Sequence, residues 1–169
     1  MEFEKLCQEL ATNAETIRAL VNGVSQTEAQ IRPTPDSWSI LEVVCHLYDE
    51  EVNDFRPRLD VILNHPDQEF APNDPQVWIT ERKYNEQDLG VMLGKFLAER
   101  EKSLEWVKGL TNSNWEASYT TPWRTMNAGD MFTSWAAHDI LHMRQLVELR
   151  YARVLRLTTP YNVEYAGGW

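Results

Sequence analysis

The chain has 169 residues, of which 43% are hydrophobic, and it carries a formal net charge of −10. This length suffices for one domain with a buried core and is short for two, so we expect a single domain over residues 1–169. The acidic balance argues against nucleic acid as a partner and against an anionic membrane surface, because phosphate-rich partners bind to basic faces.

Targeting signals and cysteine usage bear on the cellular location. No apolar run approaches the length of a transmembrane helix, and the first residues lack the layout of a signal peptide. The two cysteines, Cys7 and Cys45, form neither a disulfide framework nor a CxxC pair. We therefore expect a protein of the reducing cytoplasm, without a membrane partner.

Four segments show apolar residues at helical spacing. We expect helices over residues 2–22, 40–64, 86–110 and 128–150. Ser39 and Glu42 have capping-box spacing at the start of the second helix, and Asn127 is a good N-cap for the fourth. Pro57 should bend the second helix or cut it short.

The connections between these helices are uneven. Residues 65–85 hold three prolines and form a long link for a bundle, which lets neighbouring helices depart from simple up-down order. Residues 111–127, with Trp123 among their aromatics, leave room for a short strand or hairpin. Residues 151–169 form an aromatic tail that ends at Trp169. The sequence therefore predicts an all-α fold, a four-helix bundle with long inter-helix connections.

The histidine spacing is the strongest functional signal. His138 and His142 lie four residues apart, so both imidazoles point the same way from one helix and can reach one cation. His46, on the second helix, could complete a trio that leaves coordination positions for water or substrate. The alternative is that these are partly buried histidines hydrogen-bonded to carbonyl groups. His65, in the proline-rich connection, is interpreted as a loop residue.

Two carboxylates near these histidines need an explanation. Asp139 projects into the apolar arc of the fourth helix, where an unpaired carboxylate would be costly, so it needs a donor there. It could orient a metal-bound imidazole or make a structural hydrogen bond across the bundle. Glu50, one turn after His46, could be a fourth ligand, a general base or a solvated residue, and the sequence slightly favours the solvated residue.

The order of these motifs resembles the DinB/YfiT-like superfamily of metal-dependent enzymes. The resemblance rests on Trp38-Ser39-Ile40 leading into His46-Leu47, and on His138-Asp139 with His142 and Gln145 after them. It implies a four-helix bundle, a divalent metal such as zinc or nickel held by His46, His138 and His142, and in many members a homodimer.

The resemblance also implies a class of reaction. Members with assigned activity are thiol S-transferases that use bacillithiol or mycothiol, and others have been described as hydrolases. Our leading hypothesis is a metal-dependent enzyme that joins a low-molecular-weight thiol cosubstrate to a small-molecule substrate. A metal-dependent hydrolase is the first alternative. The second is a non-catalytic metal-binding or stress-response protein.

Overall fold

The structure, a computed structural model, describes residues 1–122 and 124–168. Trp123 and Trp169, which belong to the connection and the tail discussed above, lie outside the described residues. The elements in chain order are α1 (Phe3–Val21), α2 (Gln26–Ala29), α3 (Ile40–Asn53), α4 (Phe55–Asn64), α5 (Pro75–Glu81), the 3-10 turn η1 (Tyr84–Glu86), α6 (Leu89–Lys108), β1 (Ser118–Thr120), β2 (Thr125–Asn127), α7 (Ala128–Leu157) and the 3-10 turn η2 (Glu164–Ala166).

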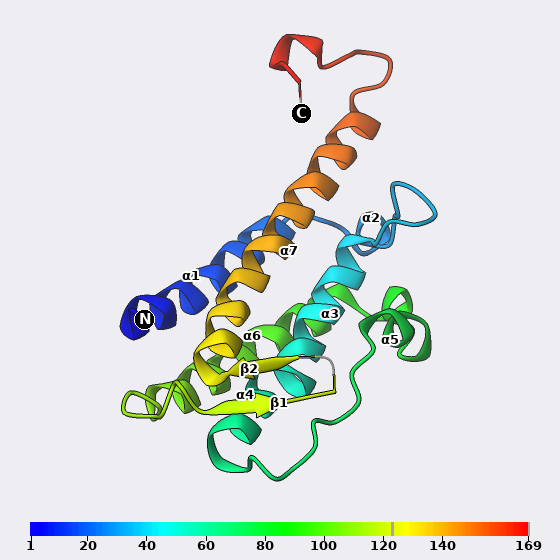
Figure 1. Ribbon diagram of the computed structural model, residues 1–169. Coiled ribbons are helices and arrows are strands. Elements are labelled where there is room, and N and C mark those ends of the chain that lie inside the picture. The colour runs from blue at the N-terminus through cyan, green and yellow to red at the C-terminus, as the bar shows by residue number, and fades with distance from the viewer. Residues whose placement is uncertain (123, 169) are drawn as a thin grey trace.

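Four long helices form the bundle, which confirms the predicted fold class. α1 packs against α6 and α7, and α3 packs against the same two helices, while α4 continues the chain of α3 along α7. In Figure 1, α7 runs past the other three helices, and its last turns extend beyond the bundle towards the C-terminus. None of the described helices has both the length and the apolar composition needed to cross a membrane.

The second and fourth helices depart most from their predicted bounds. The second helix is interrupted at Asp54, so the break falls three residues before Pro57, which occupies the third position of α4. A proline is tolerated there because the first N–H groups of a helix have no intrahelical acceptor. The fourth helix was predicted to end at residue 150, which is wrong, because α7 continues to Leu157. Residues 151–159 contain no glycine or proline that would end the helix before Pro160.

The predicted caps are present. Ser39 and Glu42 form the capping box of α3, and Asn127 and Asp130 form that of α7. The Glu42 side chain also pairs with Arg32, which ties the preceding loop to the start of α3. These caps fix where α3 and α7 begin, and these two helices carry His46, His138 and His142.

The long connections contain short elements of their own. Residues 65–85 include α5, which begins at Pro75 with Asp74 as its side-chain cap. Within the connection between α6 and α7, β1 and β2 pair antiparallel with Tyr119 opposite Met126, which is the short hairpin that the sequence allowed.

A buried arginine joins the four helices at mid-height. Arg100 of α6 is 1% exposed and donates to Asp139 of α7 through Nη1 at 2.7 Å and Nη2 at 2.9 Å. Its Nε donates to Glu51 of α3 at 2.8 Å, and Nη1 also donates to the carbonyl of Leu10 in α1 at 2.9 Å. One side chain therefore contacts every helix of the bundle.

Neutral donors complete this buried polar layer. Trp135 Nε1 and Ser103 Oγ donate to the two oxygens of Glu51 at 2.8 and 2.6 Å, and Asn13 Nδ2 donates to Asp139 at 3.3 Å. Burial alone would lower the pKa of Arg100, but the charges of Glu51 and Asp139 outweigh it and raise that pKa.

The polar layer divides the apolar core into two clusters. Along α6, Phe96 belongs to one cluster and Val107 to the other, with Arg100 between them. Along α7, Phe132 and Leu146 are divided in the same way by Asp139. The layer thus fixes the heights at which α6 and α7 can pack.

We expect Arg100→Met to lower the free energy of unfolding by about 3–5 kcal/mol, because it leaves two carboxyls buried without their cation. Arg144→Met, on the exposed side of α7, should change it by less than about 1 kcal/mol, because the one ion pair of Arg144 among the described residues is a surface pair with Glu148. Urea unfolding monitored by circular dichroism measures both. Equal losses in the two variants would contradict a structural role for the buried layer.

Candidate metal centre

Three histidines converge between α3 and α7. His46 Nε2 lies 3.3 Å from His138 Nε2, and His142 Nε2 lies 3.1 Å from the same atom. One ring nitrogen from each lies within 4.8 Å of the others, which makes the trio a group able to hold a metal ion. The four-residue spacing of the α7 pair and the independent position of His46 thus produce the predicted convergence.

The three imidazoles are neutral at physiological pH. Burial, followed by the neighbouring His142 and His138, lowers the pKa of His46 to about 2. Burial and the proximity of His142 and Arg100 lower that of His138 to about 3, and burial also lowers the pKa of His142. Three neutral imidazoles are the form that binds a metal ion.

Aromatic side chains enclose the trio. Trp38, just before α3, stacks on His142 with ring centroids 6.2 Å apart and meets His46 edge-on at 5.0 Å. Phe55, the first residue of α4, packs against His138 at 5.0 Å. The break between α3 and α4 therefore supplies one wall of the centre.

Glu50 lies behind His46 and is buried. Its Oε1 is 3.6 Å from Nδ1 of His46, and neither atom has a hydrogen-bond partner among the described residues. The preference for a solvated Glu50 is wrong, because this side chain is 4% exposed. Burial, followed by the nearby Asp54, raises the pKa of Glu50 to about 9.

Asp139 contacts none of the three imidazoles by hydrogen bond. Both of its oxygens accept from Arg100, and one also accepts from Asn13. Of the two roles considered for it, the structure shows the structural bond across the bundle. Its influence on the centre is indirect, because its bonds to Arg100 hold α7 in place at the residue next to His138.

The remaining sequence candidates lie apart from the trio. His65 ends α4, is half exposed and faces Asp60 at 3.6 Å. Cys45 is buried in the core and donates to the carbonyl of Tyr84, and burial raises its pKa to about 12. It is therefore an inert thiol.

Arg100, Glu51 and Asn13 were not named from the sequence. A signal was present for two of them, because Arg100 lies in register with Phe96 and Val107 on α6, and Asn13 with Leu10 and Ile17 on α1. A charged or amide side chain on an apolar stripe needs a buried partner. Asp139 was recognised by the same argument, but its partner could not be identified without the packing.

The geometry fits a divalent metal. Ligand nitrogens of a tetrahedral zinc ion, with bonds of about 2.0–2.1 Å, lie about 3.3 Å apart, which matches the two spacings observed. The unpartnered Nδ1 of His46 beside Glu50 is the arrangement expected of a ligating histidine and the carboxylate that orients it. The three histidines therefore suit the divalent metal that the histidine motifs imply.

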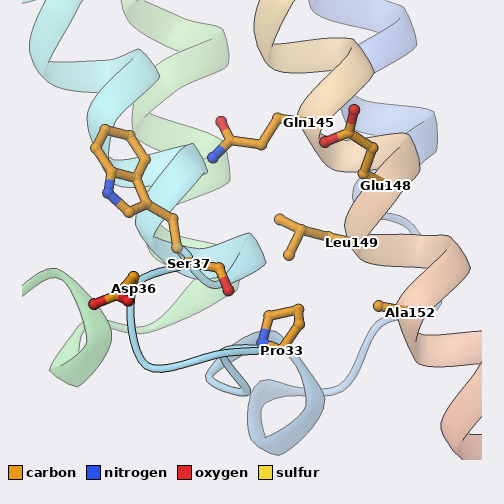
Figure 2. Close-up of a pocket in the computed structure, with 8 residues that line it drawn as sticks. Pro33, Asp36, Ser37, Gln145, Glu148, Leu149 and Ala152 are labelled. Carbon is orange, nitrogen blue, oxygen red and sulfur yellow. The ribbon is translucent and has the colours of Figure 1, made fainter.

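A cavity lies next to the centre, because Trp38 and Gln145 line it and both contact His142. It has a volume of about 390 Å³ and is lined by the loop before α3 and by one face of α7. Figure 2 shows Gln145, Glu148, Leu149 and Ala152 projecting from the helix opposite Pro33, Asp36 and Ser37 of the loop.

These features define a four-helix bundle with a trio of histidines between two helices. The family model of the DinB superfamily matches residues 9–146, and the chain belongs to this superfamily. Among curated proteins, none matches the sequence. A solved structure that it resembles is YfiT from Bacillus subtilis, described as "a probable metal-dependent hydrolase with an unusual four-helix bundle topology". That similarity has a TM-score of 0.78 at 17% identity, and it covers 88% of this chain and 85% of YfiT.

Protein purified without chelator or histidine tag should carry close to one divalent metal ion per chain. His142→Ala should lose the metal and keep its helical spectrum, because the core clusters do not depend on this half-buried side chain. His65→Ala, a matched change of an exposed histidine, should keep the metal. Elemental analysis decides. Retention by His142→Ala together with loss by His65→Ala would refute the ligand assignment.

Proposed function

We propose that the protein is a metal-dependent thiol S-transferase whose divalent ion is held by His46, His138 and His142. Zinc or nickel is the expected ion, and when bound it would stabilise the thiolate form of a thiol cosubstrate. The observation that carries the proposal is the approach of three neutral imidazole nitrogens beside a cavity. The family membership supports it.

The surrounding carboxyls favour thiol transfer over hydrolysis. A hydrolase needs a group that takes a proton from the attacking water, whereas a thiolate is already a nucleophile. Asp139 has both oxygens committed to Arg100, and Glu50 faces the Nδ1 side of His46 rather than the convergent Nε2 atoms. Gln145, which hydrogen-bonds His142, cannot act as a base.

A metal-dependent hydrolase remains the second candidate, because that is how YfiT is described. A bound ion can itself lower the pKa of water to about 7, which reduces the need for a separate base. A non-catalytic metal-binding or stress-response protein is the third, and it differs from both by lacking turnover.

Further proposals concern assembly and location. We propose a homodimer in which the exposed apolar residues of α7 are covered by a second copy. They include Ile140, Val147 and Val154, spaced seven residues apart, with Leu141 and Leu155 beside them. The reducing cytoplasm also stays a prediction, with both cysteines free.

Glu50 is proposed to orient His46 by accepting from its Nδ1–H. Removing such a carboxylate typically weakens metal binding 10–100-fold. The raised pKa of about 9 leaves Glu50 protonated at pH 7 without metal, while the histidines are neutral. A nearby cation favours the carboxylate, so zinc binding should expel the Glu50 proton.

Glu50→Gln should therefore bind zinc at least tenfold more weakly and release about one proton fewer per chain at pH 7 than the wild type. Calorimetric titration in two buffers of different ionisation enthalpy measures both quantities. Glu101→Gln, an exposed change on α6, should alter neither. Unchanged affinity and proton count in Glu50→Gln would exclude the orienting role.

The reaction itself is tested with a chlorinated aromatic electrophile. Metal-loaded wild type should speed its loss only when a low-molecular-weight thiol is present, and His46→Ala and His138→Ala should both lose that rate. Ester or amide turnover without thiol, rising with pH, would favour the hydrolase instead. Absence of both activities in metal-loaded protein would favour the non-catalytic candidate.

A further inference from the structure

Two residues that line the cavity beside the centre also contact histidines of the trio. Trp38 lines the cavity and also packs against His142 and His46. Gln145 lines it too, and its Oε1 lies 2.8 Å from Nδ1 of His142. Anything bound in the cavity therefore rests against the side chains that hold the trio in place.

Gln145 presents donors to this cavity. If His142 binds a metal through Nε2, its Nδ1 carries the proton, so the Gln145 oxygen must be the acceptor of the bond between them. The amide nitrogen of Gln145 then keeps two N–H donors, for which the described residues supply no acceptor. In Figure 2 this amide extends from α7 into the space facing the loop.

The cavity is elongated along α7. A helix rises about 1.5 Å per residue, which puts Glu148 about 9 Å and Ala152 about 15 Å beyond His142 along the axis. Its volume of about 390 Å³ is in the range of small-molecule sites. The apolar part of the lining consists of Pro33, Trp38, Leu149 and Ala152.

The charges on the lining have one sign. Asp36 and Glu148 both line the cavity, and none of the lining residues is basic. In the described part of the chain, Asp36 has no ion pair, and Glu148 has only an exposed one with Arg144 at 3.6 Å. A carboxylate on an occupant would meet like charge, whereas an ammonium would meet opposite charge.

We propose that this cavity holds the body of an elongated, mainly apolar substrate whose far end is positively charged, and that Asp36 and Glu148 discriminate against anionic substrates. The proposal rests on the proposed function, because it assumes that the reacting atom of the substrate lies at the histidine trio. It adds the substrate class and the two residues that select it.

The test uses cobalt-loaded protein and three six-carbon thiols that differ only at the far end. They are 6-amino-1-hexanethiol, 6-mercapto-1-hexanol and 6-mercaptohexanoate. Thiolate-to-cobalt charge-transfer absorption reports binding without any turnover. The amine should bind at least tenfold more tightly than the carboxylate, with the alcohol between them. Because the two carboxylates are exposed, this ratio should fall as salt is added.

Asp36→Asn/Glu148→Gln should bring the amine-to-carboxylate ratio below threefold. Asp67→Asn/Glu116→Gln removes the same net charge at exposed positions that do not line the cavity, and it should keep the wild-type ratio. A wild-type ratio near one, or an unchanged ratio in Asp36→Asn/Glu148→Gln, would overturn the proposal.

Ala152→Trp tests whether the occupant lies in the cavity. It should weaken all three six-carbon thiols at least tenfold while leaving 2-mercaptoethanol and cobalt affinity unchanged. If Ala152→Trp bound the six-carbon thiols as tightly as the wild type does, the subsite would be refuted and the metal assignment would stand. The same would follow if the cobalt-loaded wild type gave no charge-transfer signal with any thiol. Failure to bind cobalt at all would instead refute the proposed function on which the subsite rests.

Discussion

The buried ion pair of Arg100 with Glu51 and Asp139 sets the relative positions of the helices in this bundle. Glu51 lies five residues after His46 on α3, and Asp139 directly follows His138 on α7. A shift of either helix would pull a carboxyl away from the guanidinium in a medium where an unpaired charge costs several kcal/mol. The bond that stabilises the bundle therefore also fixes the height at which His46 meets His138 and His142.

This arrangement separates two kinds of acidic residue. Glu51 and Asp139 are held by Arg100 and its neutral donors, so they are structural. Glu50 is adjacent in sequence to Glu51 but points to His46, because neighbours on a helix project about 100° apart. One turn of α3 thus contributes both to the core layer and to the centre, which constrains substitution there on both sides of the helix.

The sequence predicted most of the bundle because local signals agree with the packing. Capping residues at Ser39 and Asn127, the helical periods and the spacing of His138 and His142 are all local properties. The long-range pairing could not be predicted in the same way. The sequence indicated that Asp139 needs a hydrogen-bond donor, but its partner Arg100 is 39 residues away along the chain. Only the packing of α6 against α1 and α3 brings Arg100 to Asp139.

The burial of Glu50 also depends on packing that the sequence alone does not reveal. Its distance of one turn from His46 is compatible with solvent or with burial, and the choice depends on how the rest of the bundle packs around α3. Once it is buried beside Asp54, its pKa rises, and a neutral Glu50 cannot act as a strong acceptor until a positive charge arrives nearby. The deprotonation of this carboxyl and the binding of a cation at the trio are therefore thermodynamically linked, since each favours the other. On this argument the site is assembled in full only with its metal, and the cavity residues Trp38 and Gln145 then face a centre whose imidazoles are all held in one tautomer.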